Sequence, residues 1–479
     1  MNYSIIRYML GKVFFLMGIF LLLPAFISVI YKETEGWYFF ICAVVCILLG
    51  WLLSKKPKDN TFYAREGFLV VASSWVLISL IGAVPIFVSG EFKSYTDALF
   101  EIVSGFTTTG ASVCNNVEAL SHSTLLWRSF SHWLGGMGVL VFLLAFLPMT
   151  GGQTLYFMKA ESPGPSVGKQ VPRMQKTAAF LYTTYGMLTI VEFVALVIAK
   201  MGVFDAMCTS FATAGTGGFG NYNNSIGGFS NAIQIIVTVF MMLFGINFNL
   251  YFYLVMRKFR DAFKMEEVKW YLGIYTAAVI AITVNLTQIG GNFLDNLRLS
   301  AFQGASVMTT TGFSTTDFNT WPNFSKVILL TLMFVGACAG STGGGVKISR
   351  ILIYFKTIKK ELDHLVHPRN VRTLKLEGKP IEHDVVRSAN VFFITYCVIF
   401  ALSVLIVSFE GFDAGTTFSA VLATFNNIGP GLNIVGPAGN FAPFSDLSKF
   451  VLMFDMLAGR LEIFPMLVLF TPSAWFSRR

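Results

Sequence analysis

Long apolar stretches dominate the chain and decide what it can fold into. Ten of them are close to the roughly 20 apolar residues that a helix needs to cross the hydrocarbon of a bilayer. They lie near residues 11–31, 37–53, 68–89, 126–148, 178–198, 231–256, 268–290, 325–355, 389–409 and 447–475. Only 13% of the residues are charged, against about 25% in typical soluble domains. The sequence therefore predicts an all-α integral membrane protein.

The basic residues between these stretches predict the orientation in the membrane. The chain has 35 Lys and Arg residues and a formal net charge of +9. Most of them fall in alternate loops, around 7–12, 55–65, 159–176, 257–269 and 347–387 and at 478–479. Cytoplasmic loops of membrane proteins carry such an excess of positive charge. We therefore expect both termini in the cytoplasm, and we expect membrane lipid, not nucleic acid, as the partner of this charge.

Four loops on the opposite side share one pattern. Each contains a half-length apolar stretch followed by a Gly/Thr-rich run, at 94–112, 203–221, 299–315 and 412–433. The runs align on four glycines, Gly110, Gly218, Gly312 and Gly429, called the aligned glycines below. Repetition of this kind determines a whole architecture. It predicts four span–pore-helix–filter-loop–span repeats around one central pore, with two extra N-terminal transmembrane helices. Asp97 and Asp205 are predicted to cap the first two half-helices.

The pattern also predicts domain boundaries. They are an N-terminal two-helix extension at 1–60, repeat one at 61–150, repeat two at 175–265, repeat three at 266–360, a cytoplasmic linker at 361–388 and repeat four at 389–479. Repeat three includes an intramembrane glycine loop. The stretch 356–387, which includes most of this linker, is the only sizeable charged segment of the sequence, and it is too short for a nucleotide-binding domain.

The Gly/Thr runs suggest a cation path. Non-helical backbone at membrane depth is tolerated only where it is buried in protein or lines a water-filled path. Four converging runs can surround an axis with carbonyl oxygens, which replace the hydration shell of a potassium ion in selective filters. Glycine helps because it adopts positive φ at little steric cost. One isolated Thr-Thr-Gly would be an ordinary loop, so the prediction depends on the fourfold repetition.

Two further features lie within predicted spans. Glycines between 336 and 346 interrupt a span; they either allow close helix packing or break the helix into a loop beneath the runs. Arg460 lies inside the last span, where a charge is costly and marks function by default. It either pairs with Asp455 or Glu462, or, in the interpretation we prefer, reaches the pore axis and opposes cation passage.

The motifs TTTGAS (107–112), SHWLGGMG (131–138), MTTTGFST (308–315), GACAGSTGGGVKISR (336–350), NNIGPGLN (426–433) and MLAGRLEIF (456–464) carry a family resemblance. On these motifs, and over essentially its full length, the chain resembles the TrkH/KtrB branch of the Trk/Ktr/HKT potassium transporters. The resemblance implies a potassium filter formed by Thr108, Thr109, Gly110, Thr216, Gly217, Gly218, Thr310, Thr311, Gly312, Asn427, Ile428 and Gly429. The fourth run departs from Thr-Thr-Gly, so the filter is expected to be only pseudo-fourfold.

The resemblance also implies gating, location and partners. The implied gate is an intramembrane loop with a pore arginine, comprising Gly340, Gly343, Gly344, Gly345, Lys347 and Arg460. The implied location is the bacterial cytoplasmic (inner) membrane. The implied partners are potassium, with rubidium as a substitute, a second copy of the chain, and a cytosolic nucleotide-binding regulatory ring of the TrkA/KtrA type.

Other function classes are less well supported. No cluster of nucleophile and base, or of metal ligands, points to an enzyme, and no cofactor is expected apart from the transported ion. His132 and Glu192 are interpreted as interfacial or hydrogen-bonded residues, not as proton carriers. The alternative function is a secondary transporter that couples Na⁺ or H⁺ to uptake of a small organic solute. Such proteins usually show inverted repeats, whereas the four runs here share one orientation.

Overall fold

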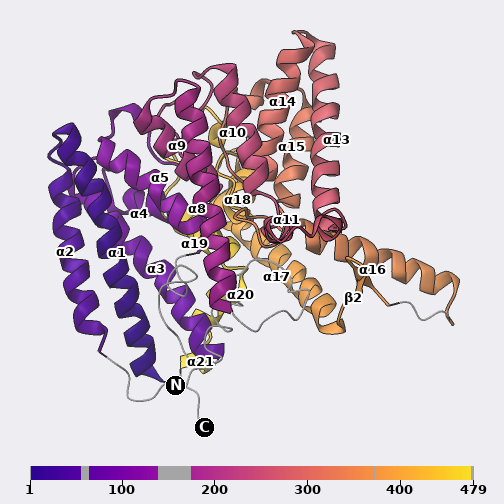
Figure 1. The fold of residues 1–479 in the computed structure, drawn as a ribbon, viewed down its shortest axis with the longest axis horizontal. Helices are drawn as coiled ribbons and strands as arrows, with labels where there is room; N and C mark the ends of the chain where they lie inside the picture. The colour runs from indigo at the N-terminus through magenta and orange to yellow at the C-terminus, as the bar shows by residue number, and fades with distance from the viewer. Residues whose placement is uncertain (1, 56–63, 139–173, 370–372, 476–479) are drawn as a thin grey trace.

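The regular structure of the described residues is almost entirely helical (Figure 1). The computed structural model describes residues 2–55, 64–138, 174–369 and 373–475. Within these ranges the only strands are β1 (Lys375–Leu376) and β2 (Lys379–Pro380), an antiparallel pair in which Lys375 lies opposite Pro380. The predicted all-α class is confirmed.

The same order of elements recurs four times: one long helix is followed by two shorter helices. The four sets are α3 (Ala64–Val88), α4 (Tyr95–Phe106) and α5 (His122–Gly136); α8 (Met174–Ile198), α9 (Val203–Gly215) and α10 (Asn231–Phe244); α13 (Glu266–Ile289), α14 (Phe293–Met308) and α15 (Asn323–Val335); and α17 (His383–Val407), α18 (Ala414–Phe425) and α19 (Asp446–Arg460). The domain boundaries themselves stay predictions.

Several predicted spans are interrupted. Six described helices are long and apolar enough to cross a membrane, and a seventh candidate is α10 with α11 (Asn249–Val255), bent by 93°. The predicted span 325–355 breaks between α15 and α16 (Ile348–Val366), and 447–475 breaks after α19, before the short α20 (Phe464–Leu469). The predicted span 126–148 runs beyond the described residues. Glycine accounts for the break after α15, because its C-cap residue, Gly336, has a φ of 70°.

The short helices form the interior, and the long helices surround them. In α4 every residue from 98 to 106 is buried, and most of α18 is also buried. The long helices instead expose large apolar side chains, such as Ile190 on α8 and Ile394 on α17. An apolar exterior around a more polar interior is the arrangement that a lipid environment stabilises.

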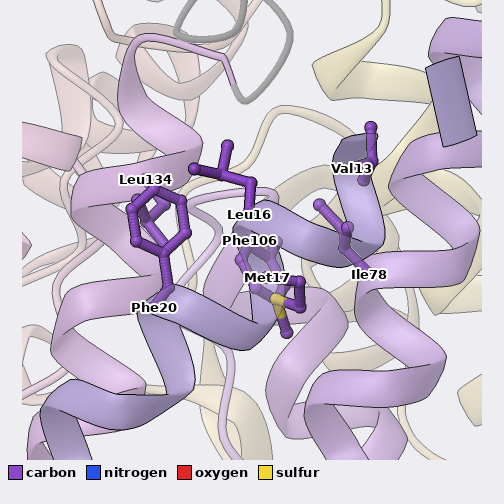
Figure 2. A pocket seen from close by; sticks show the side chains of 7 residues that line it. All are labelled: Val13, Leu16, Met17, Phe20, Ile78, Phe106 and Leu134. Carbon is purple, nitrogen blue, oxygen red and sulfur yellow. The ribbon is translucent and has the colours of Figure 1, made fainter. Parts of the chain in front are cut away.

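The N-terminal pair α1 (Tyr3–Tyr31) and α2 (Gly36–Leu53) packs closely because glycines lie at the contact. A Cβ at Gly18 would lie 2.7 Å from the carbonyl oxygen of Ala43, so only glycine permits this approach. α1 also packs against the interior around a cavity of about 10 Å³ (Figure 2), lined by Val13, Leu16, Met17, Phe20, Ile78, Phe106 and Leu134. This apolar volume is too small to be more than a packing defect.

Two features lie at the edge of the bundle. α16 projects away from the other helices (Figure 1), and it carries exposed apolar residues such as Phe355 and Leu362. The first turn of α1 lies beside α21 (Pro472–Trp475), because the Tyr3 hydroxyl donates to the Trp475 carbonyl at 3.0 Å. The two ends of the described chain therefore meet at the same end of the molecule.

Candidate functional site

The four Gly/Thr segments, residues 108–110, 216–218, 310–312 and 427–429, share one backbone conformation. The first residue of each has positive φ: 56° at Thr108, 55° at Thr216, 59° at Thr310 and 55° at Asn427. The third is a glycine with φ of 77°, 77°, 87° and 95° in the same order, while the middle residue is not left-handed. Alternation of left- and right-handed residues places successive N–H groups on one side of the chain and carbonyl oxygens on the other.

The segments close into a ring. A Cβ at Gly110 would lie 1.9 Å from the carbonyl oxygen of Gly217, and one at Gly218 would lie 2.1 Å from that of Thr311. The series continues from Gly312 to the carbonyl oxygen of Ile428 at 2.1 Å and returns from Gly429 to that of Thr109 at 2.7 Å. Each contact joins an aligned glycine to the residue before the next one. All of the predicted filter residues are therefore brought together around one axis.

The fourth segment differs from the others in its side chains. Asn427 stands where the other segments have threonine, and its amide donates to Thr109 Oγ1 at 3.0 Å and to the Met456 carbonyl at 2.9 Å. The asparagine thus ties the fourth segment to the first and to α19. Both groups that accept these hydrogen bonds are buried, so loss of the amide would leave them without this donor.

The short helices point their C-terminal ends at the ring. α4 ends at Phe106 and α18 at Phe425, each just before its segment. The negative end of a helix dipole favours a cation. The capping prediction was wrong, because the N-caps of α4 and α9 are Ser94 and Gly202. The Ser94 hydroxyl accepts a hydrogen bond from the Asp97 N–H. Asp97 and Asp205 lie in the first turns of α4 and α9, where their carboxylates can bind other elements.

A glycine loop between α15 and α16 lies directly against the ring. The Gly344 N–H donates to Thr310 Oγ1 at 2.6 Å. A Cβ at Gly343 would lie 2.7 Å from the Thr309 carbonyl oxygen, and one at Gly344 would lie 2.5 Å from that of Asn426. The loop therefore approaches the third and fourth segments more closely than any side chain would allow. The sequence left two possibilities for these glycines, close helix packing or a helix broken into a loop. In the structure the helix is broken, because α15 ends at Val335 and α16 begins at Ile348.

The other predicted gate residues shape the same loop. Gly340 and Gly345 have φ of 67° and 78°, a region that favours glycine. Lys347 also has positive φ, at 78°, and is the N-cap residue of α16. Its buried ammonium donates to the Gly343 carbonyl and so closes the loop on itself.

Arg460 is the last residue of α19 and binds this loop. One guanidinium nitrogen donates to the Thr342 carbonyl at 2.7 Å, and the other to the carbonyls of Gly135 and Gly136 at 2.5 and 2.6 Å. The latter two are the final carbonyls of α5, which favour a cation. The carboxylates considered as partners bond elsewhere: Glu462 binds Arg350 at 2.5 Å, and Asp455 accepts from Ser403 at 2.8 Å. Arg460 thus connects the ends of α5 and α19 with the glycine loop.

Comparison with known proteins agrees with this architecture. Residues 35–290 and 294–479 match the TrkH family, described as cation transport protein. This chain belongs to the TrkH family. It is 37% identical to the Trk system potassium uptake protein TrkH of Salmonella typhimurium and to that of Escherichia coli, over 99% of this chain and 100% of each relative. The crystal structure of the potassium transporter TrkH from Vibrio parahaemolyticus superposes with a TM-score of 0.89 at 34% identity, covering 99% of this chain and 100% of that one.

The sequence prediction for this TrkH-family chain missed three contacts that hold α4 or the glycine loop in place. The Arg128–Glu101 pair at 2.7 Å and the Lys449–Asp97 pair at 2.7 Å hold α4 from two sides. Glu267 accepts from the Ala339 N–H of the glycine loop at 2.6 Å. Charged residues inside apolar segments are a signal that the sequence does contain. Their partners could not be read from it, because Asp97 and Lys449 are 352 positions apart.

His132 and Glu192, which the sequence analysis did not interpret as proton carriers, are both buried. His132 is buried and hydrogen-bonded as expected, through Nδ1 to the Gly105 carbonyl at 2.8 Å and through Nε2 to the Phe219 N–H at 3.3 Å. Glu192 is buried in α8, and its carboxylate interacts with the Thr213 side chain of α9. The expectation that Glu192 is interfacial or hydrogen-bonded stays a prediction.

Proposed function

We propose that this TrkH-family chain is a potassium uptake protein of the inner membrane, in which the ring of four Gly/Thr segments is the selectivity filter. The observation that carries the proposal is the closure of the ring, in which each aligned glycine lies against the carbonyl oxygen before the next one. Relatives that align with the whole chain are named potassium uptake proteins. A ring of carbonyl oxygens is the chemistry that replaces the hydration shell of a potassium ion.

The surroundings of the ring favour a cation without binding it too tightly. The C-terminal ends of α4 and α18 face the ring and contribute partial negative charge. No carboxylate is among the filter residues, so a permeating ion meets dipoles and no full charge. Conduction requires binding that is favourable enough for entry and weak enough for exit. Dipolar ligands satisfy both conditions for a monovalent ion.

The glycine loop and Arg460 are proposed to form the gate. The loop contacts Thr310 on the ring and Arg460 through Thr342, so it obstructs the path on one side of the filter. The positive guanidinium opposes a cation by repulsion. Opening requires the loop to move away, and its glycines supply the conformational freedom for that movement.

Further parts of the proposal concern location and partners. We propose that both termini are cytoplasmic, because the basic loops lie on that side by the positive-inside rule. The projecting α16 and the β1–β2 hairpin would then face the cytoplasm, where a second copy of the chain and a nucleotide-binding regulatory ring would dock. Potassium, replaced in the laboratory by rubidium, is the transported ion and not a resident cofactor.

The proposal is tested by rubidium-tracer uptake into liposomes that contain the purified protein. Potassium should block uptake, whereas sodium and an amino-acid mixture should have little effect. Gly110→Ala should abolish uptake, because its Cβ would lie 1.9 Å from the Gly217 carbonyl oxygen. Gly273→Ala is the matched control, since a Cβ there has nothing within 4 Å. If even Arg460→Ala protein takes up no rubidium, the potassium proposal fails and the solute-transporter alternative gains.

A further inference from the structure

A buried ion pair between Glu101 of α4 and Arg128 of α5 contacts the residues that follow the first two segments. The Arg128 Nε donates to Glu101 Oε1 at 2.7 Å, and the two side chains, Arg128 and Glu101, are 2% and 0% exposed. A buried ion pair is costly unless further hydrogen bonds satisfy both groups. The contacts of this pair therefore show what it holds in place.

Glu101 binds the chain that follows the first aligned glycine. Its carboxylate accepts from the Ser112 hydroxyl at 2.9 and 3.1 Å and from the Val113 N–H at 3.0 Å. These residues come two and three positions after Gly110. The carboxylate thus fixes the exit of the first segment from the ring.

Arg128 binds the chain that follows the second aligned glycine. Its guanidinium carbon lies 4.1 Å from the centre of the Phe219 ring, a cation–π contact. One of its terminal nitrogens donates to the Gly220 carbonyl at 3.4 Å. Phe219 and Gly220 directly follow Gly218, so a single ion pair supports two adjacent quadrants of the ring.

In the third and fourth quadrants the short helix supplies a neutral side chain at the comparable place. Gln303, nine residues before Gly312 as Glu101 is before Gly110, donates to the Thr316 carbonyl at 3.3 Å. In the fourth repeat the Leu432 N–H donates to Ser419 Oγ at 2.8 Å. A polar residue on the short helix thus holds the exit of each of these segments, whereas within the described residues a buried ion pair links the first and second segments.

We propose that Glu101 and Arg128 are positioning residues for ion selection: they fix the spacing between the first and second segments and so set the preference for potassium over sodium. The inference rests on the proposed filter. Neither residue touches the ion, because each acts through the backbone that follows Gly110 or Gly218. Charge-assisted hydrogen bonds are roughly twice as strong as neutral ones, so the pair holds this side of the ring more rigidly than the neutral contacts hold the other.

The test compares the ratio of potassium to sodium inhibition of rubidium uptake in liposomes containing full-length protein. Arg128→Gln removes the charge and the contact with Gly220, and Glu101→Gln places an amide donor against the N–H of Val113. Each should lower the ratio by about tenfold, the equivalent of one lost charge-assisted hydrogen bond. Arg128→Lys keeps the charge but not the planar fork, so its ratio should fall in between.

The control is Ile282→Ala, which removes a fully buried side chain of α13 that belongs to neither the ring nor the loop. It should lower thermal stability and the amount of folded protein but leave the inhibition ratio unchanged. Wild-type ratios in both Arg128→Lys and Glu101→Gln would overturn the positioning role, even if Arg128→Gln does not fold. A wild-type protein that does not distinguish potassium from sodium would instead overturn the filter proposal, and the positioning role with it.

Discussion

Single residues in the four Gly/Thr segments occupy conformations that are unfavourable by themselves. Thr108, Thr216 and Thr310 are β-branched and yet left-handed, which costs on the order of 1–3 kcal/mol for each residue. The surrounding structure must impose this conformation, and ring closure does so because each segment is held by the next. The strain is placed where carbonyl direction matters most, which is consistent with the proposed role in ion binding.

Among single substitutions, replacement of Arg460 is expected to have the clearest effect on rubidium uptake. Arg460→Ala removes the three hydrogen bonds to Thr342, Gly135 and Gly136 and a positive charge beside the proposed path. We expect unregulated rubidium uptake to rise by at least about tenfold. Arg460→Lys keeps the charge but cannot bridge three carbonyls, so it should give an intermediate rise. Uptake that stays unchanged or falls in folded Arg460→Ala protein would contradict a gating role.

At the scale of elements, the glycine loop is held by its neighbours rather than by regular structure of its own. The Cys338 N–H donates to the Gly245 carbonyl at 3.1 Å, and the Gly340 carbonyl accepts from the Phe248 N–H at 3.0 Å. Both partners belong to the break between α10 and α11. Glu267, in the first turn of α13, joins the two regions, because it accepts from Asn247 at 3.0 Å as well as from Ala339. The loop is therefore fixed by the α10–α11 break and by α13.

This arrangement predicts different effects for two adjacent glutamates. Glu267→Gln places an amide donor against one of the two N–H groups and weakens the anchor of the loop, so unregulated rubidium uptake should rise by about tenfold. Glu266→Gln is the control, because Glu266 binds Lys356 at 2.7 Å and not the loop. Tracer uptake by the two variants at equal protein density checks this. Equal uptake in both would show that Glu267 does not restrain the loop.

The elements also show what the sequence could and could not predict. Repetition located the segments around Gly110 and Gly312, since each copy needs a left-handed glycine at the same point. The prediction that Asp97 is an N-cap failed, because a short helix can begin with any of several polar residues. In α4 the N-cap residue is Ser94. The Arg128–Glu101 pair was missed because a long-range partner leaves no periodic signal. Positions that require a particular backbone conformation can therefore be recognised in the sequence, whereas side-chain contacts between elements cannot.

At the scale of the whole molecule, the N-terminal pair α1–α2 is attached to α5 by a polar contact at one end. Glu33, between the two helices, accepts from the N–H groups of His122 and Ser123 at 2.8 and 3.2 Å and from the His122 ring at 2.8 Å. Tyr31 stacks on the same ring, with centroids 3.8 Å apart. The carboxylate therefore occupies the positive N-terminal end of α5. Through it, α1 and α2 stabilise the helix that carries Arg128.

This contact makes the stability of the molecule depend on pH in a defined direction. Burial by itself would raise the pKa of Glu33, but the hydrogen bonds from His122 and Ser123 outweigh burial and leave the pKa below its usual value. A carboxylate with a lowered pKa in the folded state stabilises the fold above its unfolded pKa and loses this contribution as the pH falls through the folded value.

Glu33→Gln should therefore lower Tm at neutral pH, and its deficit in Tm relative to wild type should shrink below about pH 4. Glu35→Gln, in the same loop, should show no such convergence. The measurement is thermal unfolding of detergent-purified protein over a pH series. A Glu33→Gln deficit that stays constant with pH would mean that the carboxylate charge does not hold α1 and α2 to α5.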